Sequence, residues 1–138
     1  MPNRVDDAIV AYLRDHSETR LAVLDVAFVE ETFHVPVSRP VRELQVGRYD
    51  VPVVCVRTGD GAGAVPAFTT VDHLLKWKPE GCLYTSLTGR ALIAMADAMP
   101  AISEILVNPN DAPRGRIPRS DFRRMLELQQ GHGHSGAG

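Results

Sequence analysis

The sequence predicts a single-domain α/β (α+β) fold: a mixed β-sheet of about five strands, including a central hairpin, packed with helices. Short runs rich in β-branched residues alternate along the chain with segments whose apolar residues recur at helical spacing. The 138 residues suit one domain and provide enough chain to bury a core. Hydrophobic residues make up 44% of the chain and charged residues 23%, which are proportions typical of globular proteins.

Two helices are predicted near the N-terminus. Residues 5–13 carry apolar side chains at helical spacing, and acidic residues occupy the first turn, where the helix dipole favours them. Ser17 is predicted to be the N-cap of a second helix, because its hydroxyl can accept a hydrogen bond from a backbone N–H of the first turn. The buried stripe of this second helix is expected to include Leu21, Leu24 and Phe28.

A short strand and a polar connection follow. Residues 33–37 have the β-branched and aromatic composition of a strand. The polar stretch 38–49 carries Arg39, Arg42 and Arg48. We expect this stretch to be a connection with one more edge strand around Leu44.

The strongest strand pattern in the sequence is residues 51–57. The run is β-branched and nearly continuous, which predicts burial on both faces of a sheet. Cys55 at its centre is therefore expected to be an inert core residue, and Cys82, which follows a loop, the more accessible thiol. Three glycines in 59–63 predict a hairpin loop to a second strand that ends at Phe68.

Helices and strands continue to alternate after this hairpin. Thr69 or Thr70 is predicted to cap one helix and Thr88 another. The polar tail, 131–138, has nothing to bury and is expected to be disordered, which leaves 1–130 as the domain. The predicted elements are, in order, a helix at 71–77, a strand at 82–87, a helix at 89–99, a strand at 105–107 and a last helix at 119–129.

Charge and hydropathy argue against two broad classes of function, general nucleic-acid binding and membrane spanning. The formal net charge is −2, whereas a general nucleic-acid binder is usually basic. No stretch approaches the roughly 20 apolar residues of a membrane span. The N-terminus becomes acidic where a signal peptide would become apolar, so we expect a cytoplasmic protein. Its cysteines have no C-x-x-C spacing and are expected to be free thiols.

The residues that could support catalysis have simpler interpretations. Thr70, Asp72 and His73 bring a hydroxyl, a carboxylate and an imidazole close together in sequence. A catalytic triad requires the base within about 3 Å of the nucleophile in space, whereas these residues fit a capped first helical turn. His132 and His134 provide two imidazoles, and a structural metal site needs about four ligands. We therefore expect no enzyme activity, no cofactor and no metal.

One local charge anomaly lies near the C-terminus. The arginines could contact phosphate or an acidic partner, or they could form the solvated face of the last helix. No aromatic residues are interleaved to stack on bases, so nucleic acid is the less favoured partner. The cluster comprises Arg114, Arg116, Arg119, Arg123 and Arg124, with Asp121 as the offsetting acid.

Several motifs together resemble a known family. Val51-Pro52-Val53 leads through a glycine turn to Val65-Pro66-Ala67-Phe68-Thr69 and a helix that ends at Trp77. Leu87-Thr88-Gly89-Arg90-Ala91-Leu92 and Ile105-Leu106-Val107-Asn108-Pro109 follow. In this order and spacing, over about 21–126, the chain resembles the SseB N-terminal domain family. This family is named for enhanced serine sensitivity and is unrelated to the secreted translocon protein of the same name.

The resemblance implies a bacterial α/β domain without an established catalytic mechanism, sometimes associated with stress or secretion loci. It provides no catalytic residues, because the family has no accepted set. The sequence departs from the family pattern in its long glycine-rich turn at 59–63. It also leaves no room for the C-terminal domain that some members carry.

We expect a non-enzymatic protein-interaction domain that uses an exposed sheet edge or a groove beside Phe68 and Trp77. The expected partner is another protein, and a homodimer also stays open. One alternative is a small-molecule sensor with a pocket between the 71–77 helix and the sheet; the serine phenotype behind the family name suggests an amino acid. The candidate binding residues are Phe68, His73, Trp77, Arg119, Arg123 and Arg124.

Overall fold

The structure is a computed structural model that describes residues 4–58 and 61–127. The predicted tail at 131–138 lies outside the described residues, so the division into a domain and a disordered tail stays a prediction. The described chain combines helices with mixed sheets, which confirms the predicted α+β class.

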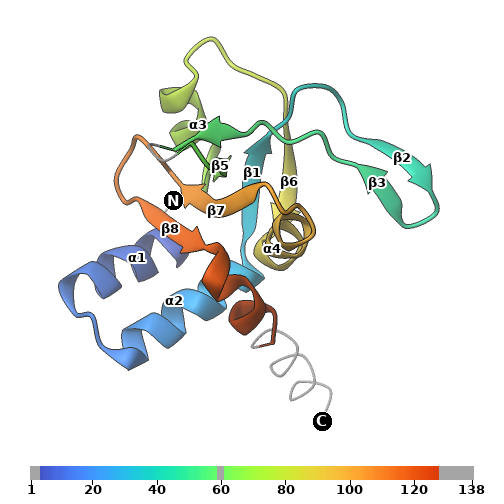
Figure 1. Ribbon diagram of the computed structural model, residues 1–138. Helices are drawn as coiled ribbons and strands as arrows, with labels where there is room; N and C mark the ends of the chain where they lie inside the picture. The colour runs from blue at the N-terminus through green and yellow to red at the C-terminus, as the bar shows by residue number, and fades with distance from the viewer. Residues whose placement is uncertain (1–3, 59–60, 128–138) are drawn as a thin grey trace.

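Two N-terminal helices pack against each other beside the sheet (Figure 1). They are α1 (Arg4–Arg14) and α2 (Glu18–Glu30), as the apolar spacing predicts. The hydroxyl of Ser17 accepts a hydrogen bond from the backbone N–H of Arg20 at 3.1 Å, which confirms the predicted cap.

The main sheet has four strands in the order β4-β5-β7-β8. Its members are β4 (Val56–Arg57), β5 (Gly63–Ala67), β7 (Ile102–Val107) and β8 (Gly115–Pro118). The predicted hairpin is confirmed, because β4 pairs with β5 in antiparallel register. β5 and β7 pair in parallel, and β7 pairs with β8 in antiparallel register. Sequence reasoning missed β8 and the first residues of β7.

A second pair of strands extends this sheet at one point. β1 (Thr32–Pro36) pairs with β6 (Tyr84–Thr88) in antiparallel register. His34 of β1 and Phe68, just after β5, exchange backbone hydrogen bonds at 2.8 and 2.9 Å. The chain therefore passes from β5 into its next helix directly at the junction of the two sheets.

The polar connection forms a ribbon of its own. β2 (Arg42–Gln45) and β3 (Arg48–Asp50) pair in antiparallel register and project from the body of the molecule (Figure 1). The expected edge strand around Leu44 is therefore one arm of a separate two-stranded hairpin.

Threonine side chains begin the two middle helices, as predicted. Thr70 accepts a hydrogen bond from the backbone N–H of His73 at the start of α3 (Val71–Trp77). Thr88 caps α4 (Gly89–Asp97) in the same way. The C-terminal segment begins as a 3₁₀ turn, Arg119–Asp121, and continues as α-helix through residues 122–127.

The segment 51–57 corrects the clearest strand prediction. Only Val56 and Arg57 belong to a strand, Val53 makes one isolated bridge, and no residue of the segment is buried. Pro52 has no N–H to donate to a ladder, and the segment returns from the projecting hairpin to the sheet. The expected order of the thiols is also wrong, because Cys55 is exposed and Cys82 is partly buried.

The core lies between the helices and the sheets. Its largest fully buried side chains include Phe33, Phe68 and Phe122. Among the described residues, no helix is long and apolar enough to cross a membrane.

Candidate functional site

The predicted groove beside Phe68 and Trp77 is not formed as expected. Phe68 is fully buried, so its side chain does not line an exposed groove. Its ring lies 5.4 Å from the ring of Trp77, which is itself partly buried. The ammonium group of Lys78 lies 5.8 Å from the centre of the Trp77 ring. A role for Trp77 in binding stays a prediction.

The side chain of Arg119 already binds partners within the protein. Its guanidinium group donates hydrogen bonds at 2.6–3.2 Å to four backbone carbonyl groups at and after the end of α4. The last carbonyls of a helix lack a full set of partners within the helix, so this arginine adds donors at the end of α4 and ties the C-terminal segment to it. The four acceptors belong to Ala96, Asp97, Met99 and Ile102.

Arg124 also acts within the fold, whereas Arg123 points outward. Arg124 donates to the buried carboxylate of Asp25 at 2.5 Å and lies 3.4 Å from that of Asp121. Burial raises the pKa of Asp25, and the neighbouring Arg124 opposes this rise by favouring the carboxylate. Arg123 is exposed, and its role in binding stays a prediction.

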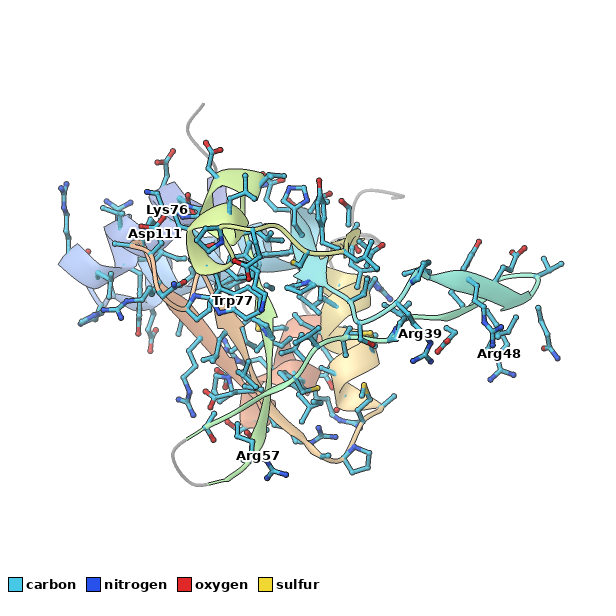
Figure 2. The ribbon with its side chains drawn as sticks, turned by 90° about the horizontal axis from the view of Figure 1, so that it is seen from above. Arg39, Arg48, Arg57, Lys76, Trp77 and Asp111 are labelled. Carbon is cyan, nitrogen blue, oxygen red and sulfur yellow. The ribbon has the colours of Figure 1, made fainter. Side chains whose placement is uncertain are left out.

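His73 lies in a cluster that sequence reasoning did not find. Its Nδ1 is 2.6 Å from Asp111 Oδ2, and its Nε2 is 2.9 Å from Asp6 Oδ2. Asp6 belongs to α1 and Asp111 to the loop between β7 and β8, so the imidazole joins three distant segments. Lys76, one turn further along α3, lies 3.2 Å from the same Asp111 oxygen (Figure 2).

The two carboxylates favour the charged imidazolium. Burial of the ring opposes its protonation, but the hydrogen bonds to Asp6 and Asp111 outweigh this effect and raise the pKa of His73. The same contact with His73, helped by Lys76, lowers the pKa of Asp111. The ring is therefore a donor at both nitrogens when protonated.

Asn108 extends the cluster into the core. It is fully buried, with a φ of 50°, a conformation that Asn tolerates better than most residues. Its side-chain amide donates to Asp6 Oδ1 at 3.2 Å and to the carbonyl of Pro113 at 3.0 Å. Its oxygen accepts from the backbone N–H of Thr69 at 3.1 Å. We call Asp6, Thr69, His73, Asn108 and Asp111 the carboxylate–imidazole cluster.

This cluster has the ingredients of a catalytic triad but a different geometry. Both ring nitrogens of His73 already contact carboxylates, and the hydroxyl of Thr69 lies 2.7 Å from Asp6 Oδ1 rather than beside the imidazole. Among the described residues, no group of three or more His, Cys, Asp or Glu side chains is arranged to hold a metal ion. The cluster is built to hold α1, α3 and the β7–β8 loop together.

The β2–β3 hairpin and its turn carry three exposed apolar side chains. Leu44, Val46 and Tyr49 are 56%, 97% and 58% exposed, and we call them the hairpin apolar patch. Asp50 Oδ2 lies 3.0 Å from the guanidinium group of Arg39 and 4.0 Å from that of Arg42. Figure 2 shows Arg39 and Arg48 on this projecting arm, away from Lys76 and Asp111.

Comparison with known proteins identifies the family. The model of the SseB protein N-terminal domain matches residues 5–122. No curated protein and no solved structure matches the chain. The matched region contains almost all of α1, the helices α2, α3 and α4, the mixed sheet and the carboxylate–imidazole cluster. Because the match spans most of the sequence, this chain belongs to the SseB N-terminal domain family.

Proposed function

We propose that this chain is a non-enzymatic protein-interaction module whose contact surface is the β2–β3 hairpin. The observation that carries the proposal is the hairpin apolar patch, which is exposed on a projecting arm. A cytoplasmic location and a role in stress or secretion belong to the same proposal.

The energetics of the hairpin support a docking role. A two-stranded hairpin is only marginally stable by itself in water. Burying a large apolar side chain fully contributes roughly 1.5–3 kcal/mol. Leu44, Val46 and Tyr49 would gain part of this free energy against a partner, because all three are more than half exposed in the isolated chain.

The carboxylate–imidazole cluster supports the non-enzymatic part of the proposal. A general base needs a nitrogen that is free to take the proton of a nucleophile. The contacts of His73 with Asp6 and Asp111 occupy both nitrogens. Although Cys55 is exposed, desolvation by the protein atoms around its thiol raises the pKa of that thiol, which opposes formation of the reactive thiolate.

The sensor alternative requires a pocket beside α3. Five cavities of about 160 to 580 Å³ are formed by described residues, and none of these five has a lining residue from α3. The largest lies between α2 and the C-terminal segment and is open to solvent, with Asp25 and Arg124 in its wall. These five cavities therefore give the sensor alternative no support beside α3.

The test is affinity capture from native lysate, read by mass spectrometry, with a hairpin variant beside the wild type. The variant replaces Leu44, Val46 and Tyr49 together by Ser. A matched control replaces three other exposed apolar residues, Leu13, Val23 and Leu83, by Ser.

A partner that is stoichiometric with the wild type and the control, and lost from the hairpin variant, supports the proposal. A partner that the hairpin variant retains would place the contact elsewhere and contradict it. The absence of any stoichiometric partner would also count against an interaction module.

A further inference from the structure

We infer that the outer edge of β3 receives an extended, acidic segment of the partner protein as an added strand. This inference rests on the proposed function and names the chemistry of its partner. The inference rests on two features of the hairpin that occur together: a strand edge of regular geometry, and more arginine side chains than carboxylates on one face.

The two edges of the hairpin differ. Within the described chain, β2 and β3 form a sheet of two strands, so each has one outer edge. The register pairs Glu43 with Tyr49 and Gln45 with Arg48, which places one extra residue, Leu44, on β2. Such a bulge bends and twists a strand and opposes further pairing, so the regular edge belongs to β3.

The polar face of the hairpin carries unbalanced positive charge. Arg42 and Asp50 are directly opposite each other, and Arg48 lies two residues from Asp50, on the same face of the strand. Arg39 and Arg42 share the single carboxylate of Asp50, and the side chain of Arg48 makes no ion pair or hydrogen bond with the described residues. Two guanidinium groups thus share one carboxylate, and Arg48 adds a third positive charge on the same face of β3, in a chain whose net charge is negative.

A strand that alternates acidic and apolar residues fits both faces of this edge. Its carboxylates would lie over the arginine face, where Arg48 can bind a carboxylate through two parallel hydrogen bonds. Its apolar side chains would lie on the opposite face, beside Tyr49. Backbone pairing along β3 would supply the affinity that is common to strand addition in peptide recognition.

Two other occupants fit less well. A second copy could pair β3 with β3 around Tyr49 and place Arg48 opposite Asp50, but it would join two faces that both carry excess positive charge. Single-stranded nucleic acid needs phosphate contacts and stacking aromatics on one surface. Tyr49 instead lies on the face opposite to the arginines, with Glu43 as its cross-strand neighbour.

The experiment selects a displayed library of random linear peptides on the full chain. The expected outcome is enrichment of peptides that alternate Asp or Glu with apolar residues. The dissociation constant of an enriched peptide is then measured by fluorescence polarisation against the wild type, R48E and the control R90E. Arg90 is an exposed arginine on α4, so R90E makes the same charge change on another element.

R48E should weaken peptide binding by about tenfold to a hundredfold, because it replaces one charge-assisted pair by repulsion. R90E should leave the dissociation constant within about twofold of the wild type. Two further peptides carry N-methyl groups on the odd-numbered or on the even-numbered backbone amides. One of these two peptides should lose binding, because only every second N–H of an added strand donates to its neighbour.

Enriched peptides without acidic residues, or equal affinity for R48E and the wild type, would overturn the inference. Dimerisation that R48E disrupts would identify a second copy as the occupant, and binding of oligothymidylate that R48E abolishes would identify nucleic acid; either result also overturns it. If the partner captured from lysate depends on Leu44, Val46 and Tyr49 but tolerates R48E, the proposed function stands and the acidic strand fails. If the triple hairpin variant and R48E both still capture the partner, the proposed function fails as well.

Discussion

Replacement of His73 by Gln tests whether the carboxylate–imidazole cluster holds the fold together. Gln is neutral at all pH values and has nearly the same reach, so it removes the imidazolium without creating a large cavity. The variant loses the charged contacts of Nε2 with Asp6 and of Nδ1 with Asp111. Asp6 keeps its hydrogen bond from Asn108 and its short contact with Thr69.

The contact with Asp6 sets the expected magnitude. At 2.9 Å, with both side chains mostly buried, it is a charge-assisted hydrogen bond worth about 1.5–3 kcal/mol of unfolding free energy. For a domain of this size, a loss of that order lowers the melting temperature by about 5–12 °C. The contact with Asp111 is closer to solvent, and Asp111 retains Lys76 in the variant.

The destabilisation should depend on pH in a direction fixed by the pKa shifts. The folded-state pKa of His73 lies above its ordinary value of 6.5, so its stabilising contribution is complete below about pH 6.5 and is lost as the pH rises through the folded-state pKa. The pKa of Asp111 lies below 3.8, so its contribution is present above that value and is lost only in stronger acid. The gap between wild type and H73Q should therefore be widest between about pH 4 and pH 6.5.

Urea unfolding of both proteins at about pH 5.5 and about pH 9 measures this gap. The matched control is H34Q, because burial lowers the pKa of His34 and reverses the sign of its linkage. The contribution of His34 should be present above about pH 6.5 and lost as the pH falls through its lower folded-state pKa. A gap for H73Q that is equal at both pH values, or that stays below about 0.5 kcal/mol, would refute the reasoning.

Three further substitutions test the packing by calorimetry or urea unfolding. G89A should cost more than about 4 kcal/mol or prevent folding, because a Cβ there would lie 1.4 Å from the carbonyl oxygen of Phe28; a normal melting curve would contradict this. F68A should cost about 3–5 kcal/mol, and a loss below about 1 kcal/mol would return Phe68 to the surface. R119M should cost about 2–4 kcal/mol because it removes four hydrogen bonds to backbone carbonyl groups, although those of Ala96 and Met99 keep a backbone N–H donor. The exposed R123M should change stability by less than about 0.5 kcal/mol, and equal effects would contradict the anchoring role.

The sequence correctly predicted those elements whose defining contacts join residues close together in the chain. Ser17, Thr70 and Thr88 begin their helices as predicted, because a cap bonds an N–H only three residues further along the chain. The three glycines at 59–63 correctly predicted the β4–β5 hairpin, because glycines in a short loop between two strand-like runs favour such a connection.

Predictions from residue type alone were wrong where they concerned how distant segments pack against one another. The β-branched run at 51–57 has the composition of a central strand, but Pro52 and the return from the projecting hairpin keep all of it from full burial. The arginines near the C-terminus have the composition of a binding surface, but Arg119 and Arg124 are occupied by carbonyl and carboxylate groups of other elements.

By itself, the sequence determined the α+β class, the helix caps, the central hairpin and the family. Only the tertiary structure decided that His73 meets Asp6 and Asp111, which lie 67 and 38 residues away in the chain. It also decided that β2 and β3 form an arm of their own, with three apolar residues exposed. The physical reason is that caps and turns depend on neighbours in sequence, whereas burial and the partners of charged groups depend on which distant segments the fold brings together.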